Sequence, residues 1–492
     1  MAKKAVVIGG GIGGLCGAVR LARMGWDVHL YEKNSVAGGK MGRISEAGFY
    51  FDTGPTLITM PFVLEELFSF CGCSMDDYLS LVPVDPVCRY FYADTEPFDA
   101  VTDTAAMEES IGRRFPADRG RYARFMKYSR AIYDASLDTF ITFPIHELRR
   151  MMRLRNLRLL PSLFRIDALR TVHRSVCRFF KDPHLVQLFD RYPTYNGSDP
   201  FQAPATLNVI PHVELGLGGF YIQGGLYTLV RALKDLAGML GVSIHTNTEV
   251  TEIFHQGGRV TGIRAGIDTV AADSVLCNAD VVYSHQALLP GLGSEAKRLS
   301  RLEPSLSGIV FCWGVRGHFQ SLAQHNILFS RDYRKEFNQI FRQLTIPDDP
   351  TIYISVSSKA DREHAPEGHE NWFVLLNMPY VSPGHVWDGQ TVSQIKTGIL
   401  EKLRTFGLDV EKDIVFERVI TPKDFDVLFH SNRGSIYGIS SNTAGSAFTR
   451  PPNRSRKIKG LYFAGGSTHP GGGVPMCMLS AKIAADLMQE YE

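Results

Sequence analysis

A glycine-rich motif near the start of the chain has the residue types and spacing of a nucleotide-binding turn. Residues 4–8, Lys-Ala-Val-Val-Ile, form an apolar run, and Gly9, Gly11 and Gly14 follow it with the spacing GxGxxG. In such turns the first glycine permits a tight bend, the second lets the backbone approach a pyrophosphate, and the third lets helix and strand pack closely. The expected chemistry is binding of a dinucleotide at a helix N-terminus, where backbone N–H groups are unpaired.

The elements that must position this motif follow in the required order. The run 4–8 predicts a buried parallel strand, the apolar spacing after Gly14 predicts a helix, and residues 27–31 predict a second strand. Glu32 ends that second strand, where a carboxylate accepts hydrogen bonds from a ribose diol and disfavours a 2′-phosphate. An isolated GxGxxG motif is weak evidence for nucleotide binding. Here a strand, a helix, a second strand and an acidic residue follow at the expected spacing, which favours a dinucleotide site over a merely structural turn.

A second strand-then-glycine pattern occurs near the end of the chain. Residues 461–464 are apolar, Gly465 and Gly466 follow, and three glycines at 471–473 precede Pro475. The apolar spacing beyond Pro475 predicts a helix that begins at this proline, because the first helical position needs no N–H donor. The bare backbone of the three glycines is suited to lie against a flat ligand.

Several further segments carry a family resemblance. They are Gly38-Gly39-Lys40-Met-Gly-Arg43, residues 51–56, Asn278-Ala-Asp280, "GSIYGISSN" at 434–442, residues 447–455, and "GGSTHPGGGVPMCMLSAK" at 465–482. With the N-terminal motif, they resemble the bacterial-type phytoene desaturase family of the flavin-containing amine oxidase and carotenoid desaturase superfamily. NAD and FAD can share the N-terminal motif, and the resemblance implies FAD. If the strand at 461 joins the same sheet as the strand at 4, the helix after Pro475 directs its positive end at the flavin ring, where negative charge of the reduced ring would be stabilised.

The residues expected at the FAD site are Gly9, Gly11, Ile12, Gly13, Gly14, Glu32, Lys40, Gly54, Pro55, Thr56, Val250, Asn278, Gly465, Gly466, Gly473, Val474, Pro475 and Met476. The resemblance implies that the backbone at Val250 meets the adenine and that Asn278 lies near the nucleotide. Lys40 stands where an arginine is usual, which keeps the charge but loses the bidentate fork. Arg43 is a candidate to compensate for that loss.

The expected fold is α/β, with a Rossmann-like FAD-binding domain of the amine oxidase and GDP-dissociation-inhibitor type. Leucines at helical spacing over 226–240 and strands around 242–247, 260–265 and 274–277 resemble the family's second contribution to that domain. We predict an FAD-binding domain from residues 1–75, 215–285 and 450–492. Residues 76–214 and 286–449 are predicted to form an inserted α+β domain that binds substrate and associates with the membrane.

Charge is balanced over the chain, with a net charge of +2, but it is concentrated locally. Residues 146–181 interleave arginines with apolar residues and carry a local net charge of +8. This pattern predicts a basic helical region that contacts anionic lipid, with a solvated face or nucleic acid as alternatives.

No run reaches the roughly 18 apolar residues of a spanning helix, glycines interrupt the apolar N-terminal run, and the cysteines are scattered. A cytoplasmic, peripherally membrane-associated protein with reduced thiols and no nucleic-acid partner is expected.

The resemblance implies an FAD-dependent desaturase that removes a hydride and a proton from an acyclic carotenoid, with quinone or oxygen as electron acceptor. The segment 191–214 and the Val-Pro-Met at 474–476 favour the hydroxycarotenoid 3,4-desaturase branch over a general phytoene-type desaturase. No catalytic side chain is assigned. His212 and Glu214 follow the segment 195–211 and are candidates to reach the substrate, but they and His469 are more typical of structural or flavin-contacting residues. No histidine–carboxylate cluster predicts a metal site.

Three alternatives remain at the level of sequence. A carotenoid cis-trans isomerase would use reduced FAD without net formation of double bonds. A GDP-dissociation-inhibitor-like protein would bind a prenyl lipid without flavin chemistry, but the complete glycine motif with Glu32 disfavours it. An amine oxidase would need a small aromatic cage in place of a long channel.

Overall fold

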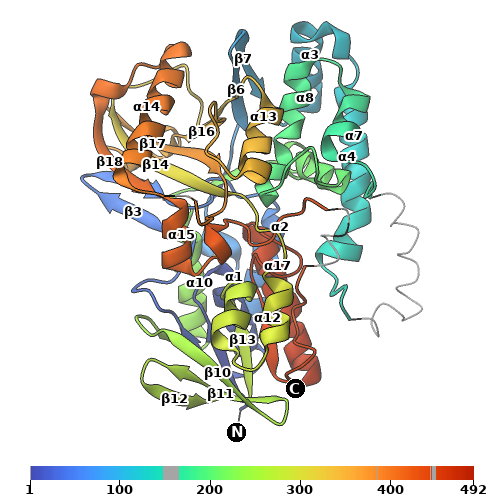
Figure 1. The fold of residues 1–492 in the computed structure, drawn as a ribbon, viewed down its shortest axis with the longest axis vertical. Coiled ribbons are helices and arrows are strands. Elements are labelled where there is room, and N and C mark those ends of the chain that lie inside the picture. The colour runs from blue at the N-terminus through green and yellow to red at the C-terminus, as the bar shows by residue number, and fades with distance from the viewer. Residues whose placement is uncertain (1, 148–165, 385, 444, 446–449) are drawn as a thin grey trace.

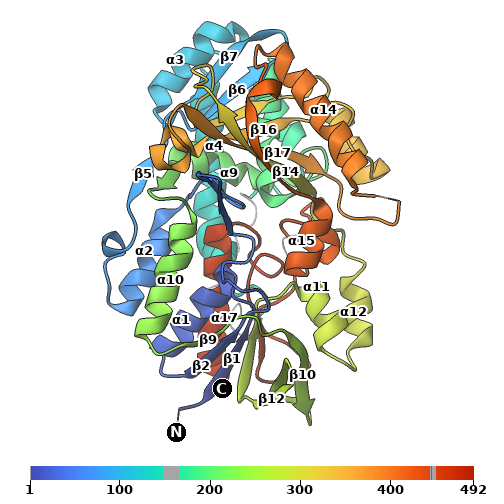
Figure 2. The same cartoon turned by 90° about the vertical axis from the view of Figure 1, so that its left-hand side faces the viewer.

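Two sheets form the two ends of the molecule, and the chain passes between them several times (Figures 1 and 2). The computed structural model describes residues 2–147, 166–384, 386–443, 445 and 450–492. A five-stranded sheet lies near both termini, and a seven-stranded sheet lies at the opposite end. The site described below lies where the two parts meet.

The five-stranded sheet is parallel throughout and has the order β19-β13-β1-β2-β9. Its strands are β1 (Lys4–Ile8), β2 (Asp27–Tyr31), β9 (Ser243–His245), β13 (Ser274–Cys277) and β19 (Leu461–Phe463). The predicted strand at 461 therefore joins the same sheet as the strand at 4. Strands from the N-terminal, middle and C-terminal segments build one sheet, and the exact domain boundaries stay predictions.

The two faces of this sheet are covered differently. Along β1, Ala5 and Val7 face one apolar core while Val6 and Ile8 face another, as expected for side chains that alternate along a strand. The first core contains the helices α1 (Ile12–Arg23), α2 (Pro61–Cys71), α10 (Tyr227–Met239) and α17 (Val474–Tyr491). The second contains β10 (Val250–Gln256), β11 (Arg259–Ala265), β12 (Asp268–Ala271), α11 (Val281–Tyr283) and α12 (Gly293–Leu299).

The seven-stranded sheet has the order β18-β14-β17-β16-β15-β6-β7, and β15 and β6 are its parallel pair. The strands are β6 (Cys88–Tyr92), β7 (Thr95–Ala100), β14 (Ser307–Arg316), β15 (His325–Leu328), β16 (Ile352–Ser355), β17 (His369–Met378) and β18 (Ile414–Ile420). The apolar face of α14 (Gly389–Thr405) covers one side. Two short pairs, β3 (Arg43–Glu46) with β4 (Phe49–Asp52) and β5 (Leu81–Pro83) with β8 (Phe220–Ile222), connect the two parts.

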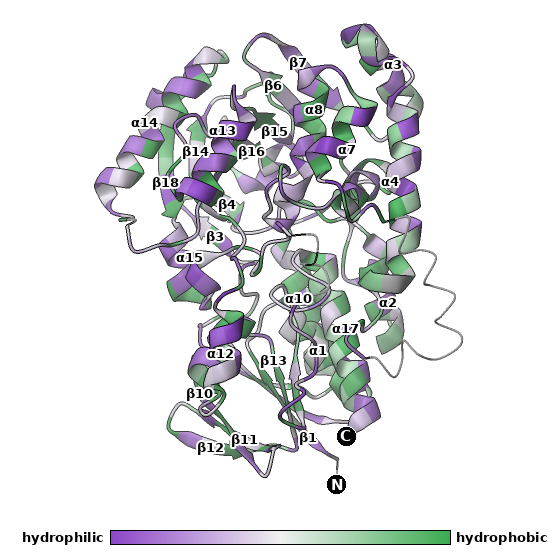
Figure 3. Cartoon of the chain, turned by 45° about the vertical axis from the view of Figure 1, so that its right-hand side comes forward, coloured by the Kyte–Doolittle hydropathy of each residue, from purple (hydrophilic) through white to green (hydrophobic). Residues whose placement is uncertain are grey.

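The remaining helices pack beside the seven-stranded sheet or link it to the rest. They are α3 (Thr104–Arg114), α4 (Tyr122–Ser136), α7 (Val172–Phe179), α8 (Pro183–Asp190), α9 (Val209–Pro211), α13 (Tyr333–Asn338) and α15 (Pro422–Phe429). Figure 3 shows mixed polar and apolar faces on outer helices such as α3 and α14, which is typical of helices with one side in water. Residues 148–165 of the predicted basic region, and 447–449 of the family resemblance, lie outside the described residues.

Candidate active site

A cavity of about 670 Å³ runs from the carboxyl edge of the five-stranded sheet to the underside of the seven-stranded sheet. One end is lined by the two glycine-rich turns and the start of α17. The other end is lined mainly by apolar side chains, among them Ile210, Val310, Ile327 and Leu375. A polar cradle and an apolar chamber therefore form one continuous space, of the size typical of a ligand site.

The first glycine turn presents bare backbone to this cavity. Gly9 has a φ of +90°, which glycine adopts without strain, and Gly11 caps α1 without a side-chain hydrogen bond. No acidic residue occupies the first turn of α1, so its N–H groups and positive dipole end stay available to an anion. A Cβ on Gly11 would lie 2.9 Å from Nδ2 of Asn278, whose own Nδ2 approaches the Gly9 carbonyl oxygen at 3.4 Å.

Glu32 supports this turn as well as lining the cavity. Its carboxylate accepts hydrogen bonds from the backbone N–H of Gly10 at 2.7 Å and of Asn34 at 2.9 Å. The segment with Gly38 and Gly39 folds back over the same turn, since the Gly38 N–H donates to the Gly10 carbonyl at 2.8 Å. The carboxylate thus orders the turn and lies at the end of β2, where the sequence predicts the contact with ribose.

The second glycine turn lies directly beside the first. Gly465 follows β19 with a φ of +109°, and a Cβ added to Gly13 would lie 3.0 Å from the Gly465 Cα. Beyond this turn, Gly473 caps α17 with a φ of +99°. The helix begins at Val474, so the prediction that Pro475 occupies the first helical position is wrong by one residue. Proline still fits there, because none of the first N–H groups has a partner within the helix.

The structure brings 17 of the 18 predicted FAD-site residues to this cavity. Gly14 is the exception: a Cβ there would overlap the Gly9 carbonyl oxygen, so this glycine permits contact between α1 and the end of β1. Gly54 has a comparable role, because a Cβ at that position would overlap the Lys40 carbonyl oxygen. Whether each lining residue touches FAD stays a prediction.

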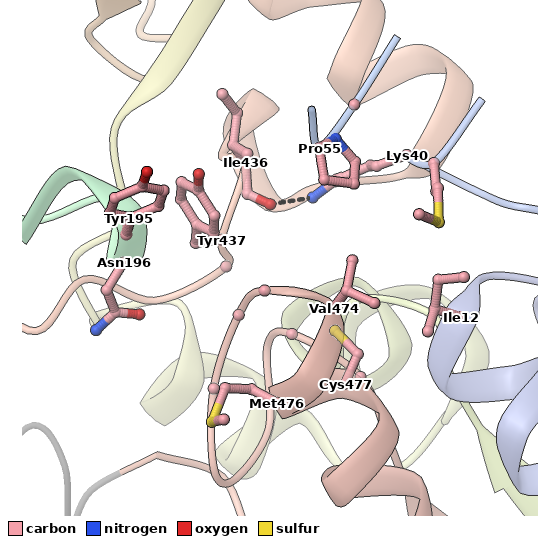
Figure 4. A pocket seen from close by; sticks show the side chains of 18 of the residues that line it. Ile12, Lys40, Pro55, Tyr195, Asn196, Ile436, Tyr437, Val474, Met476 and Cys477 are labelled. Atoms are coloured by element: carbon pink, nitrogen blue, oxygen red, sulfur yellow. Dashed lines mark hydrogen bonds between the residues drawn. The ribbon is translucent and has the colours of Figure 1, made fainter. Parts of the chain in front are cut away.

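Lys40 lines the cavity and is held by the loop before the second glycine turn. Its ammonium group donates to the Ser435 carbonyl oxygen at 3.0 Å. It also donates to the Ile436 carbonyl oxygen at 2.7 Å, a bond that Figure 4 shows as a dashed line. Burial lowers the pKa of Lys40 to about 8, and the nearby Asp280 carboxylate opposes that shift. Arg43 does not line the cavity; its guanidinium lies over the Tyr227 ring, 5.0 Å from the centroid. Arg43 therefore does not compensate for the arginine that the family usually has at the position of Lys40.

Several polar side chains lie among the apolar walls of the cavity, and only some of them were predicted from the sequence. Glu214 and Tyr195 line it, whereas His212 does not and packs against Tyr133 instead. His469 lines the cavity with its Nε2 2.8 Å from the Phe143 carbonyl oxygen. His325 and Tyr353 were not predicted, because no local motif marks them. Arg191 begins the segment 191–214 that favours the hydroxycarotenoid branch, but no role was predicted for its side chain.

Comparison with known proteins agrees with this geometry. The model of the flavin-containing amine oxidoreductase family matches residues 12–489. The chain belongs to this family. The predicted fold and the predicted cofactor, FAD, are confirmed, and the protein is an FAD-dependent oxidoreductase. The enzymatic assignment disfavours the non-enzymatic alternative.

Curated relatives within this flavin-dependent family confirm the predicted resemblance to carotenoid desaturases. A 1-hydroxycarotenoid 3,4-desaturase of Flavobacterium sp. (strain P99-3) is 37% identical over 99% of this chain and 99% of its own length. A 4,4'-diapolycopene oxygenase of Methylomonas sp is 35% identical over 98% and 97%. A zeta-carotene-forming phytoene desaturase of Myxococcus xanthus is 34% identical over 99% and 94%.

Solved structures show the same fold at low sequence identity. An oxidoreductase from Methanosarcina mazei matches with a TM-score of 0.64 at 17% identity, covering 98% of this chain and 100% of that one. A redesigned putrescine oxidase also matches with a TM-score of 0.64, at 12% identity and with both chains fully covered. At these identities the likeness concerns the fold alone.

The residues present fit an FAD molecule. The bare turns at Gly9–Gly11 and Gly465, the uncapped start of α1 and the carboxylate of Glu32 supply space for a backbone approach, N–H donors for phosphate and an acceptor for a diol. Lys40 supplies a positive charge to the same cavity. A dinucleotide requires these hydrogen-bonding and charged groups, and it also requires glycines at the points where its phosphates approach the backbone.

The pKa of Lys40 predicts how FAD binding responds to pH. A dianionic pyrophosphate binds best to protonated Lys40, so the affinity of the apoprotein should be highest below pH 8 and fall as the ammonium loses its proton above about pH 8. Lys40→Met should bind FAD about tenfold or more weakly at neutral pH, with little pH dependence. Lys40→Arg keeps its charge and should bind FAD evenly across this range.

Fluorescence titration of apoprotein with FAD between about pH 6.5 and 9.5 measures these affinities. Arg43→Met is the matched control, since Arg43 is exposed and lies outside the cavity. An affinity in Lys40→Met equal to that of the wild type would show that Lys40 does not contact the cofactor.

Proposed function

We propose that this protein desaturates an acyclic carotenoid, with a preference for one that carries a hydroxyl near one end. The observation that carries the proposal is the continuous cavity, because it joins an FAD cradle to an apolar chamber. A relative 37% identical over nearly the whole chain is named a 1-hydroxycarotenoid 3,4-desaturase, and a second is named a phytoene desaturase. These names support an acyclic polyene as the substrate.

The chain's own residues contribute mainly by placement and by exclusion of water. Bound FAD would supply the acceptor for the hydride that leaves the substrate, and the proton that leaves the neighbouring carbon would be taken up when the final acceptor is reduced, for example a quinone to the quinol. The apolar walls around Val310, Ile327 and Leu375 keep water from the positive charge that develops on the polyene. The second glycine turn is bonded to α17, because the Gly465 N–H donates to the Ser480 hydroxyl oxygen at 3.1 Å, and the start of α17 lines the same cavity. Quinone or oxygen would then remove the two electrons from the cofactor.

Product analysis tests this proposal directly. The purified, yellow holoprotein is incubated with acyclic carotenoids in liposomes, with a quinone under anaerobic conditions or with oxygen. We expect products that have lost two hydrogens and absorb at longer wavelength. An unchanged mass with altered geometry would indicate an isomerase, and a gain of oxygen would indicate an oxygenase such as the Methylomonas relative. Either result contradicts desaturation.

We further propose that the face beside α7 contacts the membrane. Leu169 is 96% exposed next to Arg170, and Arg174 and Arg178 are exposed on α7. Ile166, a few residues earlier, lines the cavity, so this face and the apolar chamber are close along the chain. A substrate that dissolves in lipid would enter from this side. None of the described helices is both long and apolar enough to cross a bilayer.

Vesicle sedimentation measures this contact. Leu169→Glu combined with Arg174→Glu and Arg178→Glu should weaken binding to anionic vesicles by about tenfold or more, since each basic residue near the surface contributes about 1 kcal/mol. Lys297→Glu with Arg301→Glu, exposed on and just after α12, is the control and should bind like the wild type. Equal binding by all three proteins would argue against this face.

A further inference from the structure

A buried ion pair lies in the wall of an otherwise apolar chamber. Arg191 and Glu214 are 5% and 1% exposed, both line the cavity, and an Nη of Arg191 donates to Oε1 of Glu214. Arg191 follows α8, and Glu214 lies in the turn His212–Gly216. A buried pair of this kind seldom stabilises a fold more than apolar residues of the same size would. Its presence therefore calls for another explanation.

Tyrosines complete the pair into a cluster. The Glu214 carboxylate accepts hydrogen bonds from the hydroxyls of Tyr192 at 3.0 Å and of Tyr195. The Arg191 Nε–H donates to the Tyr90 hydroxyl at 2.7 Å, and the guanidinium lies 4.3 Å from the Tyr192 ring centroid. Both charges are thus neutralised and held rigidly, while Arg191 still has more N–H donors than these contacts use.

His325 provides an independent observation that points to a ligand. It is 2% exposed and lines the same cavity, and its Nδ1 lies 2.8 Å from the Tyr353 hydroxyl, which in turn contacts the Thr56 hydroxyl. Its Nε2 is buried without a hydrogen-bond partner among the described residues. Burial, together with the nearby Arg191 charge, lowers the pKa of His325 to about 3, so the ring is neutral.

An unpartnered buried nitrogen is costly, so this group is suited to a partner that arrives with the ligand. A neutral imidazole has one donor and one acceptor nitrogen, and which of them is Nε2 depends on the tautomer. A hydroxyl satisfies either tautomer because it both donates and accepts. A hydrocarbon satisfies neither, and a carbonyl satisfies only the tautomer with a proton on Nε2.

We infer that the cluster of Arg191, Tyr195, Glu214 and His325 binds a hydroxyl substituent on the otherwise apolar substrate. This inference rests on the proposed desaturation and adds the residues that select an oxygenated acyclic polyene over the pure hydrocarbon. The surrounding walls are formed by side chains such as Ile210, Val213, Phe373 and Leu375, which supply no hydrogen bonds to a polyene.

The position of the cluster also bears on which bond reacts. Tyr195 lies beside Tyr437 at one side of the pocket, and the start of α17 with Met476 and Cys477 lies below them (Figure 4). A hydroxyl held at Tyr195 would keep the carbons next to it close to the start of α17. The cluster therefore acts on specificity and on the position of the new double bond, and we assign it no proton transfer.

A matched pair of substrates tests the inference. Two acyclic carotenoids with the same polyene, one with a terminal tertiary hydroxyl and one without, are compared by kcat/KM, and the products are mapped. The wild type should favour the hydroxylated substrate at least about tenfold, and Tyr195→Phe and His325→Phe should each reduce that ratio about tenfold. Desaturation by these variants should also spread to other bonds.

Tyr92→Phe is the matched control. Tyr92 is buried and its hydroxyl donates to the His184 carbonyl oxygen at 2.9 Å, but it does not line the cavity. The Tyr92→Phe variant loses a comparable hydrogen bond and should keep the wild-type ratio of kcat/KM for the two carotenoids. Competitive inhibition by a tertiary alcohol and by the alkane of the same skeleton gives a second readout. The wild type should bind the alcohol more tightly than the alkane, whereas Tyr195→Phe should bind the two with equal affinity.

The outcomes separate this inference from the proposed function. An unchanged ratio in both Tyr195→Phe and His325→Phe would overturn the hydroxyl site and leave the proposed function standing. Desaturation of both carotenoids with equal kcat/KM would overturn the site together with the preference for a hydroxylated substrate, and would leave desaturation of an acyclic carotenoid standing. Failure to desaturate either carotenoid would count against the proposed function itself. A ratio that falls equally in Tyr92→Phe would also overturn the site, because the effect would then follow from lost stability.

Discussion

Gly14→Ala is expected to lose its FAD although Gly14 does not line the cavity. A Cβ at this position would overlap the Gly9 carbonyl oxygen, and both groups belong to backbone that cannot rotate away. The start of α1 must then move from the end of β1, which separates Gly11 and Gly13 from Asn278 and Gly465. Overpacking of this kind costs about 1–3 kcal/mol of folding free energy, and loss of the turn geometry should lower FAD affinity at least about tenfold.

The flavin released per mole of purified protein and the Tm measure this effect. Gly238→Ala is the matched control, because Gly238 is exposed near the end of α10 and a Cβ there meets no atom within 4 Å. The same substitution at that position should leave flavin content unchanged and stabilise the protein by about 0.5–1 kcal/mol. Full flavin content and an unchanged Tm in Gly14→Ala would show that contact between α1 and β1 does not shape the turn.

The sequence could predict this part of the site because its geometry is local. Three glycines at fixed spacing, a strand before them and an acid after the next strand each impose their own backbone requirement. The turn, α1 and Glu32 consequently lie as expected. Val250 and Asn278 both line the cavity, near which the family resemblance places them. Asn278 does so because the order of the parallel strands brings the ends of β13 and β1 together.

The polar cluster could not be predicted in the same way. Arg191, Glu214 and His325 come from a helix end, a π-helical turn and a strand of the seven-stranded sheet, and only the tertiary fold brings them to one cavity. A buried arginine has no signature in a single sequence, because most arginines are exposed. The partners of Lys40 were unforeseen for the same reason, since Ser435 and Ile436 are distant in sequence and offer backbone carbonyls that any residue carries.

Arg191→Ala should destabilise the protein by about 3–5 kcal/mol, because it leaves the Glu214 carboxylate buried without its cation. Glu214→Ala should have a comparable effect, with the Arg191 guanidinium left unpaired. If the pair serves the fold alone, replacing both residues with methionine should lower the free energy of unfolding as much as either single substitution does. If instead the pair is retained for recognition, Arg191→Met combined with Glu214→Met should fold with nearly wild-type stability.

The free energy of unfolding from urea denaturation, measured for the wild type, both single variants and the double methionine variant, closes this cycle. A stable double variant that retains FAD but desaturates hydroxylated and hydrocarbon carotenoids at similar kcat/KM would separate recognition from folding. This follows because methionine fills the volume of the pair and extends the apolar wall, while it removes every charge that could orient a hydroxyl. A double variant as unstable as the single ones would instead mean that Tyr90, Tyr192 and Tyr195 need the ion pair to satisfy their own hydroxyls, and the cluster would then be a structural element of the core.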